Sequence, residues 1–115
     1  MIEVKLIKEK NNFKSVLITG HAGYADSGYD LVCASVSSLA MGLSNYLLEV
    51  EKISIDDLNF HAIENEEASL FSINIDDPSI YNRPGVQSGF KFFEISIFSL
   101  IQDYKDYLKL VYREV

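Results

Sequence analysis

The segment GHAGYADSGYDLVC, residues 20–33, holds one of the two histidines of the chain, His21, and its only cysteine, Cys33. A cysteine thiolate is a nucleophile, and a neighbouring imidazole can accept the thiol proton and later protonate a leaving amine. We expect His21 at the end of a strand and Cys33 in the first turn of the next helix. Unpaired amides at a helix start favour the thiolate and could also bind the oxyanion of a tetrahedral intermediate. The pair therefore predicts a nucleophile, a general base and oxyanion donors in one short segment.

A structural interpretation of Cys33 stays open beside this one. A lone cysteine next to apolar residues such as Leu31, Val32 and Ala34 is most often a small buried hydrophobic residue, and the spacing alone does not decide. Zinc is disfavoured because one cysteine and two histidines are too few for its usual ligand set. We predict no metal site and no cofactor.

Further candidate site residues flank the pair. Asp30 directly precedes the expected helix, where its carboxylate either caps the first turn or orients His21. Ser37 lies one helical turn beyond Cys33 and either supports the site by a hydrogen bond or lets the helix pack closely. The loop of residues 22–29 is a candidate flap over a substrate. Its candidate substrate-binding residues are Gly23, Tyr24, Gly28 and Tyr29.

Hydrophobic periodicity predicts the elements that must position these residues. The expected order is β-β-α-β-β-α, with strands at 2–8 and 13–19, a helix at 31–49, strands at 57–64 and 69–75, and a helix at about 90–112. This order is typical of an α+β fold in which an antiparallel or mixed sheet carries two helices on one face. The 115 residues suit a single domain, 1–115, with one core.

Two other regions bear on function. Residues 76–89 contain both prolines and two glycines, so we expect a long loop there. Its part from Ile80 to Gly89 is a second candidate for closing over a substrate. His61 alternates with apolar neighbours in an expected strand, which predicts a surface histidine on the other face and not a catalytic one.

The charge balance narrows the classes of partner. Seventeen acidic and ten basic side chains give a net charge of −7, which repels phosphate backbones and anionic lipid and favours a basic partner. We therefore expect binding neither to nucleic acid nor to a membrane. The first residues, MIEVKLIKEK, alternate apolar and charged types and do not read as a signal peptide. We expect a cytoplasmic protein.

The segment GHAGYADSGYDLVCASVSSLA, residues 20–40, resembles the signature of the ribosomal-processing cysteine protease family, Prp. It has the Gly-His-Ala start, a variable loop with a Gly-x-Asp step, and Val-Cys-Ala followed by Val-Ser. The resemblance implies a small cytoplasmic bacterial endopeptidase that removes a short N-terminal extension from a large-subunit ribosomal protein. It implies His21 as the base and Cys33 as the nucleophile, and Asp30 matches the family's Asp position.

The same resemblance implies an aromatic-rich cleavage motif and a homodimer, for which the apolar residues of the last helix would permit an interface. The alternative from another class is a non-catalytic module that binds a ribosomal protein or an assembly intermediate. Such a module does not need a reactive thiol, so the pH dependence of Cys33 alkylation separates the two hypotheses. A third hypothesis gives Cys33 a mixed disulfide or thioester intermediate.

Overall fold

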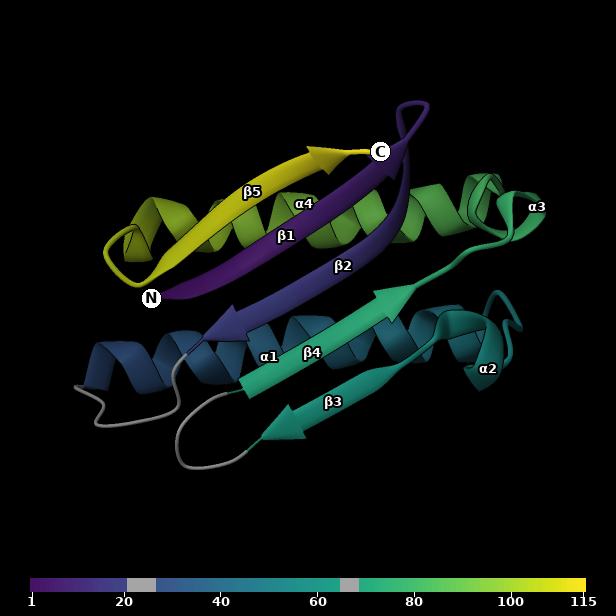
Figure 1. Cartoon of the computed structure of the whole chain (residues 1–115). Coiled ribbons are helices and arrows are strands. Elements are labelled where there is room, and N and C mark those ends of the chain that lie inside the picture. Colours follow the sequence, from purple (N-terminus) through teal and green to yellow (C-terminus); the bar gives the residue numbers. More distant parts are fainter. Residues whose placement is uncertain (21–26, 65–68) are drawn as a thin grey trace.

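A mixed β-sheet carries two long helices, α1 (Ser27–Glu49) and α4 (Pro84–Tyr104), side by side on one face (Figure 1). The computed structural model describes residues 1–20, 27–64 and 69–115, apart from the side chains of residues 27–30, 64 and 69. Within those residues the sheet has five strands in the order β3-β4-β2-β1-β5. Their bounds are β1 Ile2–Glu9, β2 Asn12–Gly20, β3 His61–Glu64, β4 Ser69–Asn74 and β5 Leu108–Glu114. Two short helices complete the described elements, α2 (Ile55–Leu58) and α3 (Pro78–Tyr81).

The β1–β2 hairpin lies at the centre of the sheet. Its turn residues Lys10 and Asn11 have positive φ angles of 51° and 68°, as a tight turn that matches the strand twist requires. β2 pairs antiparallel with β4, and β4 pairs antiparallel with β3. β5 pairs in parallel with β1, which makes the sheet mixed.

The core fills the space between the sheet and the two long helices. Val4, Leu6 and Val16 from the strands are completely buried, as are Leu47 of α1 and Phe90 of α4. Each large apolar side chain buried in this way contributes roughly 1.5–3 kcal/mol. Phe13 and Phe90 stack with their ring centroids 5.8 Å apart. The apolar residues that alternate along the strands and those that recur every three or four positions along the helices therefore pack together in one core.

β5 corrects the prediction of a helix up to residue 112. α4 ends at Tyr104, and the chain returns as a strand in which Leu108 lies opposite Ile2. Leu108, Leu110 and Tyr112 alternate with other residues and fit a strand, but the positions of Tyr104 and Leu108 also fit a helix. The hydrogen-bonded pairing with β1 makes this segment a strand, although its apolar spacing fits both a strand and a helix.

The expected loop at 76–89 is also wrong, because most of it is helical. Asp77 accepts a hydrogen bond from the Ser79 amide at 2.9 Å and caps α3, and Pro78 lies in the first turn of that helix. Pro84 likewise opens α4. Both prolines occupy first-turn positions, where the missing N–H is not needed.

The expected strand at 57–64 starts later than predicted. Residues 55–58 form α2, whose N-cap Ser54 accepts a hydrogen bond from the Asp57 amide at 3.1 Å. Asn59 ends the helix in the left-handed region with φ 47°, and β3 begins at His61. The α+β class and the mixed sheet are confirmed, whereas the order with two helices and four strands is wrong.

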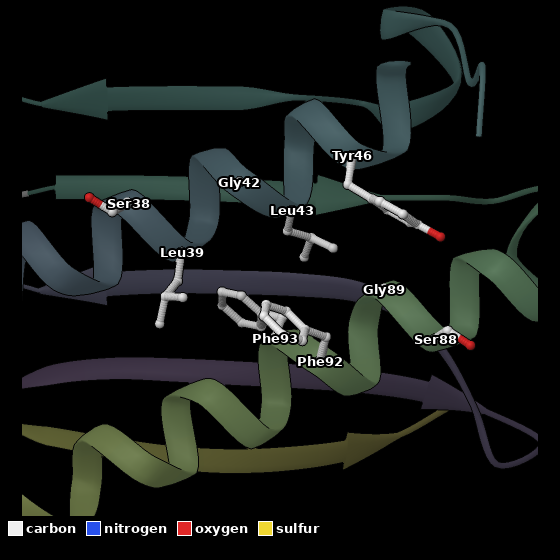
Figure 2. A pocket seen from close by; sticks show the side chains of 9 residues that line it. All are labelled: Ser38, Leu39, Gly42, Leu43, Tyr46, Ser88, Gly89, Phe92 and Phe93. Carbon is white, nitrogen blue, oxygen red and sulfur yellow. The ribbon is translucent and has the colours of Figure 1, made fainter. Parts of the chain in front are cut away.

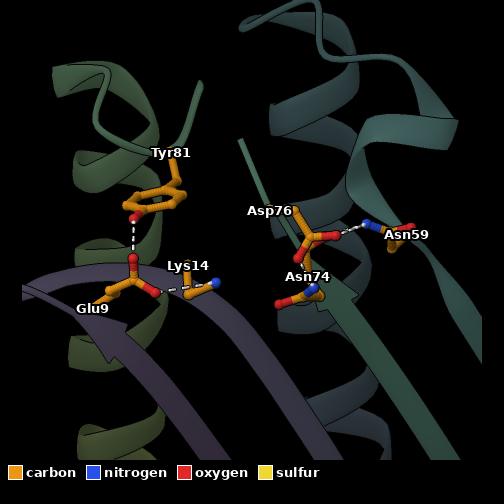
Figure 3. Close-up of polar contacts among 6 residues, drawn as sticks. All are labelled: Glu9, Lys14, Asn59, Asn74, Asp76 and Tyr81. Atoms are coloured by element: carbon orange, nitrogen blue, oxygen red, sulfur yellow. Dashed lines mark hydrogen bonds and ion pairs between the residues drawn. The ribbon is translucent and has the colours of Figure 1, made fainter. Parts of the chain in front are cut away.

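Polar contacts secure the end of the sheet farthest from the start of α1 (Figure 3). Glu9 accepts a hydrogen bond from the Tyr81 hydroxyl at 3.1 Å and lies 3.5 Å from the Lys14 ammonium. Burial, and next the hydrogen bond to Glu9, raise the pKa of Tyr81. Asn59 donates to the Asn74 carbonyl at 2.7 Å. These contacts hold α2 and α3 on the strands.

One helix among the described residues, Leu31–Glu49 of α1, is long and apolar enough to cross a membrane. Its buried stripe, which includes Val32, Val36, Ala40 and Leu47, packs in the core between the sheet and α4. Core helices of globular proteins have the same length and composition, so the finding is weak evidence for a membrane span.

Candidate active site

Cys33 lies near the start of α1, at the end of the sheet where β2 and β3 finish and β4 begins (Figure 1). Its side chain is partly buried and packs against the core. β2 ends at Gly20, so His21 is the next residue along the chain, but His21 itself lies outside the described residues. The elements on either side of the predicted pair therefore meet at one end of the molecule.

The start of α1 corrects the expected position of the thiol. The helix begins at Ser27 and not at residue 31, so Cys33 is its seventh residue and lies in the second turn. Only the first four amides of a helix lack a partner within it. In a regular helix the Cys33 amide donates to a carbonyl one turn back, so it cannot also bind an oxyanion. Oxyanion donors must come from residues 27–30 or from another segment.

The same early start relocates three other candidates. Asp30 falls inside the helix and not before it, so it is not the N-cap residue. Gly28 and Tyr29 belong to α1 and not to a loop. Gly23 and Tyr24 lie outside the described residues, as do the side chains of residues 28–30.

The second candidate flap, residues 80–89, lies far from Cys33. It belongs to α3 and the beginning of α4, at the opposite end of the sheet from the start of α1 (Figure 1). Ile80, Tyr81 and Val86 are buried in the core, at 8%, 3% and 0% exposure. This segment is a packed part of the fold and does not close over the thiol.

His61 is exposed, as expected of a surface histidine. It is in register with Ser72, which is in register with Leu17. The neighbours of Leu17, Val16 and Ile18, are buried under the helices, so Leu17 and His61 belong to the other face of the sheet. His61 is therefore on the opposite face of the sheet from α1.

An apolar groove lies along α1 between this helix and the β3–β4 pair, and its first α1 residues, Val36 and Ser37, are one turn beyond Cys33; we call it the thiol-side groove. Its volume is about 230 Å³. Ser37 lies in it and is exposed, so it does not serve close helix packing. The lining residues are Ile18, Val36, Ser37, Ala40, Met41, Ala62, Ile63, Leu70 and Phe71.

A second groove, which we call the interhelical groove, lies between α1 and α4 on their outer side (Figure 2). Its volume is about 450 Å³. Tyr46 crosses from α1 and donates a hydrogen bond to the Gly85 carbonyl at 2.9 Å. The lining residues are Ser38, Leu39, Gly42, Leu43, Tyr46, Ser88, Gly89, Phe92 and Phe93.

Neither groove was predicted from the sequence. The signal available on α1 was the spacing of Cys33, Ser37 and Met41, which puts a thiol, a small residue and an exposed apolar residue on one helical stripe. Met41 is 45% exposed although it follows the buried Ala40 on a core helix. Outside residues 21–30 and 64–69, no three His, Cys, Asp or Glu side chains lie close enough together to hold a metal ion.

Comparison with known proteins places these features in a family. Residues 1–109 match the family described as cysteine protease Prp. No curated protein sequence matches the chain. The solved structure of SMU.848 from Streptococcus mutans is similar with a TM-score of 0.87 and 27% identity, over 100% of this chain and 96% of that one.

Two solved structures of the essential ribosomal processing protease Prp from S. aureus have the same fold. The complex with a substrate peptide has a TM-score of 0.78 at 19% identity. The complex with a covalently linked product peptide has a TM-score of 0.76 at 21% identity. Each comparison covers 98% of this chain and 100% of the other. The resemblance noted at residues 20–40 is thus confirmed over nearly the whole chain, which is a cysteine protease and belongs to the Prp family.

Proposed function

We propose that residues 1–115 form one protease domain that removes a short N-terminal extension from a bacterial large-subunit ribosomal protein. Cys33 is the nucleophile and His21 is the general base. The observation that carries this proposal is that a chain of a cysteine protease family contains a single cysteine. The family's reaction needs a thiol, and Cys33 is the only one available.

The face of the sheet on which His61 lies supports the choice of His21 as the base. The chain has two histidines, and His61 is on the opposite face of the sheet from the helix that bears Cys33. His21 directly follows β2, which ends at the same end of the sheet as the first turns of α1 (Figure 1). Of the two imidazoles, only His21 follows a strand that finishes at the end of the sheet where α1 begins.

The reaction has two halves. His21 accepts the proton of the Cys33 thiol, and the thiolate attacks the scissile carbonyl carbon to form a tetrahedral intermediate. The peptide C–N bond then breaks, the amine leaves with the proton from His21, and a thioester remains on Cys33. A water molecule next gives a proton to His21 and attacks the thioester, which releases the carboxylic acid and regenerates the thiol. No metal ion or cofactor takes part.

A substrate from the ribosome suits the charge of the chain. The net charge is −7, and a basic protein is attracted to such a surface, which raises the rate of encounter more than the affinity. The S. aureus relative is a ribosomal processing protease and was solved with a substrate peptide and with a covalently linked product peptide. We place this chain in the cytoplasm, where ribosomal proteins are made and assembled.

The test is cleavage of an N-terminally extended ribosomal-protein peptide, measured by mass spectrometry. We expect Cys33→Ala and His21→Ala each to reduce kcat by a factor of at least about 1,000, because the nucleophile and its base act as one unit. His61→Ala is the matched control and should retain full activity. Normal trimming by Cys33→Ala would overturn the mechanism. Binding of the peptide without cleavage by the wild-type chain would favour the non-catalytic alternative.

We also propose that the chain forms a homodimer through the outer face of α4 and the interhelical groove. Phe92, Ile95 and Phe98 on α4 are 70%, 56% and 59% exposed, and Phe92 stands at the groove (Figure 2). A ring beside a groove is self-complementary, because a two-fold axis places each ring in the groove of the other copy. Residues 31–48 of α1 contain no charged side chain. The α1 side of the interface therefore adds no like-charge repulsion between two copies that each have a charge of −7.

A further inference from the structure

We propose that the thiol-side groove is a specificity subsite that binds one large apolar side chain of the substrate, two or three residues from the scissile bond. This inference rests on the proposed role of Cys33 as the nucleophile. It names the surface that selects the peptide, which the reaction itself does not define.

The groove is in line with the thiol. Val36, Ser37, Ala40 and Met41 follow Cys33 by three, four, seven and eight residues, which is one stripe of α1. With a rise of 1.5 Å per residue, these positions lie about 5–12 Å from Cys33 along the helix axis. An extended peptide advances about 3.3 Å per residue, so a peptide with its carbonyl at Cys33 spans this distance in two or three residues.

The lining of the groove defines the chemistry of its occupant. Ser37 is the one polar side chain among the lining residues that the structure describes. Val36, Ala40 and Ile18 are buried, at 3%, 2% and 8% exposure, and form an apolar floor. Such a surface stabilises an apolar side chain, and it would leave the polar groups of a charged side chain without partners.

The volume of the groove sets the size of that side chain. An apolar cavity of about 150 Å³ is large enough to bind benzene. The thiol-side groove has about 230 Å³, and Met41 on its α1 side remains 45% exposed. One aromatic or large aliphatic side chain fits it, and binding would cover the exposed apolar surface of Met41.

The interhelical groove is not an alternative position for this subsite. Its α1 residues Ser38, Gly42 and Tyr46 lie on another side of the helix from Cys33, as helical spacing requires. A peptide held there would have to pass around α1 to reach the thiol. The position relative to Cys33, and not the volume, selects the thiol-side groove.

The experiment compares Met41→Glu with Asn45→Glu in cleavage of a peptide series. Each variant adds one negative charge to an exposed position of α1, but Asn45 does not line either groove. The series keeps one extended ribosomal-protein peptide and replaces each apolar residue within three positions of the scissile bond by alanine. In the wild-type chain, we expect one replacement to lower kcat/KM by about tenfold to a hundredfold, chiefly through KM.

Met41→Glu should lower kcat/KM for the parent peptide by a similar factor and should discriminate little between that peptide and its alanine version. Asn45→Glu should behave like the wild-type chain, and Met41→Leu should restore the discrimination. The alkylation rate of Cys33 by iodoacetamide should be the same in all variants, which shows that the thiol is intact.

The outcomes separate the two proposals. If Met41→Glu and Asn45→Glu cleave every peptide alike while the wild-type chain remains active, the subsite proposal is wrong and the protease mechanism stands. A shift of Met41→Glu in oligomeric state, with peptide discrimination unchanged, would also overturn the subsite. A wild-type chain that cleaves no extended peptide would overturn the proposed function instead.

Discussion

The two sides of α1 offer a comparison within one helix. At 100° per residue, Ser37 and Ala40 lie within about 40° of Cys33 around the helix axis, whereas Gly42 and Tyr46 lie about 140–180° away. Both sides carry an apolar groove, of about 230 Å³ and about 450 Å³. The smaller groove is the one in line with the thiol. With Cys33 as the proposed nucleophile, we assign the substrate to the smaller groove, because its position relative to the thiol is a better criterion than its volume.

The largest effect that separates the two sides should come from Phe92→Glu. A carboxylate at this 70% exposed position would be desolvated in the proposed dimer, and we expect the dissociation constant of the dimer to rise by about a hundredfold or more. Cleavage of a short peptide per Cys33 should stay within about twofold of the wild-type rate. Sedimentation equilibrium and peptide assays on the same sample measure both.

Met41→Glu is the matched variant for the thiol side and should have the reverse pattern, with an intact dimer and impaired cleavage. A Phe92→Glu chain with the same oligomeric state as the wild-type chain would show that the outer face of α4 is not the interface. A wild-type chain that is monomeric at all concentrations would refute the dimer itself.

Two glycines of the interhelical groove allow a sharper test of its packing. A Cβ atom at Gly89 would lie 2.7 Å from the Tyr46 ring, whereas nothing lies within 4 Å of a Cβ at Gly42. The Tyr46 ring cannot swing away without breaking its hydrogen bond to the Gly85 carbonyl. We expect Gly89→Ala to lower the free energy of unfolding by about 1–3 kcal/mol. Gly42→Ala should raise it by about 0.5–1 kcal/mol through helix propensity.

Urea unfolding of both glycine variants in the monomeric Phe92→Glu background measures these values without a contribution from association. Equal effects of the two substitutions would contradict the close approach of Tyr46 to Gly89. In a chain that keeps the wild-type Phe92, a dimer weakened by Gly42→Ala would show that the second copy contacts the groove at Gly42.

The smallest effect concerns the contact that holds α4 to the sheet. Tyr112 of β5 donates a hydrogen bond to Glu94 of α4, and the Lys91 ammonium lies 2.7 Å from the same carboxylate. Burial alone would raise the pKa of Glu94, but these two hydrogen bonds lower it below its ordinary value. Burial, and next the Glu94 carboxylate, raise the pKa of Tyr112 to about 12.

The folded pKa of Tyr112 is above the ordinary value of 10.0, so folding favours the protonated hydroxyl. Its stabilisation is complete below pH 10 and is lost as the pH rises towards 12. Because Tyr112 is 54% exposed, solvent screening limits the effect to about 1 kcal/mol or less. The stability difference between the wild-type chain and Tyr112→Phe should shrink between these pH values in urea titrations. A difference that does not vary with pH would contradict this account.

Periodicity predicted the parts of the fold in which local pattern and tertiary packing agree. The stripe of Val32, Val36, Leu43 and Leu47 predicted α1, and the alternation in β1 predicted a strand. β5 was missed because its apolar residues satisfy both periods, and the choice depends on pairing with a strand about 100 residues earlier. The prolines were misread because a first-turn proline and a loop proline look alike in sequence.

The site shows the same limit. The signature at residues 20–40 indicated a cysteine protease, whereas the twelve-residue spacing of His21 and Cys33 alone left a structural role for the thiol open. The thiol-side groove could not be predicted, since Ala62 and Phe71 reach α1 only through the pairing of β3 and β4. The position of Cys33 in the second turn depended on where the helix begins, and the propensity of Gly28 and Asp30 argued against an earlier start.

The parallel pairing of β5 with β1 has a consequence for how a newly synthesised molecule matures. Until residues 108–114 are made, β1 has β2 as a partner but lacks the strand on its other side. The Ile2 amide donates a hydrogen bond to the Tyr107 carbonyl at 2.8 Å, and this bond cannot form until Tyr107 has been made. Contacts this distant in sequence form late in folding. A nascent chain therefore carries Cys33 through most of its translation before the five-stranded sheet is complete.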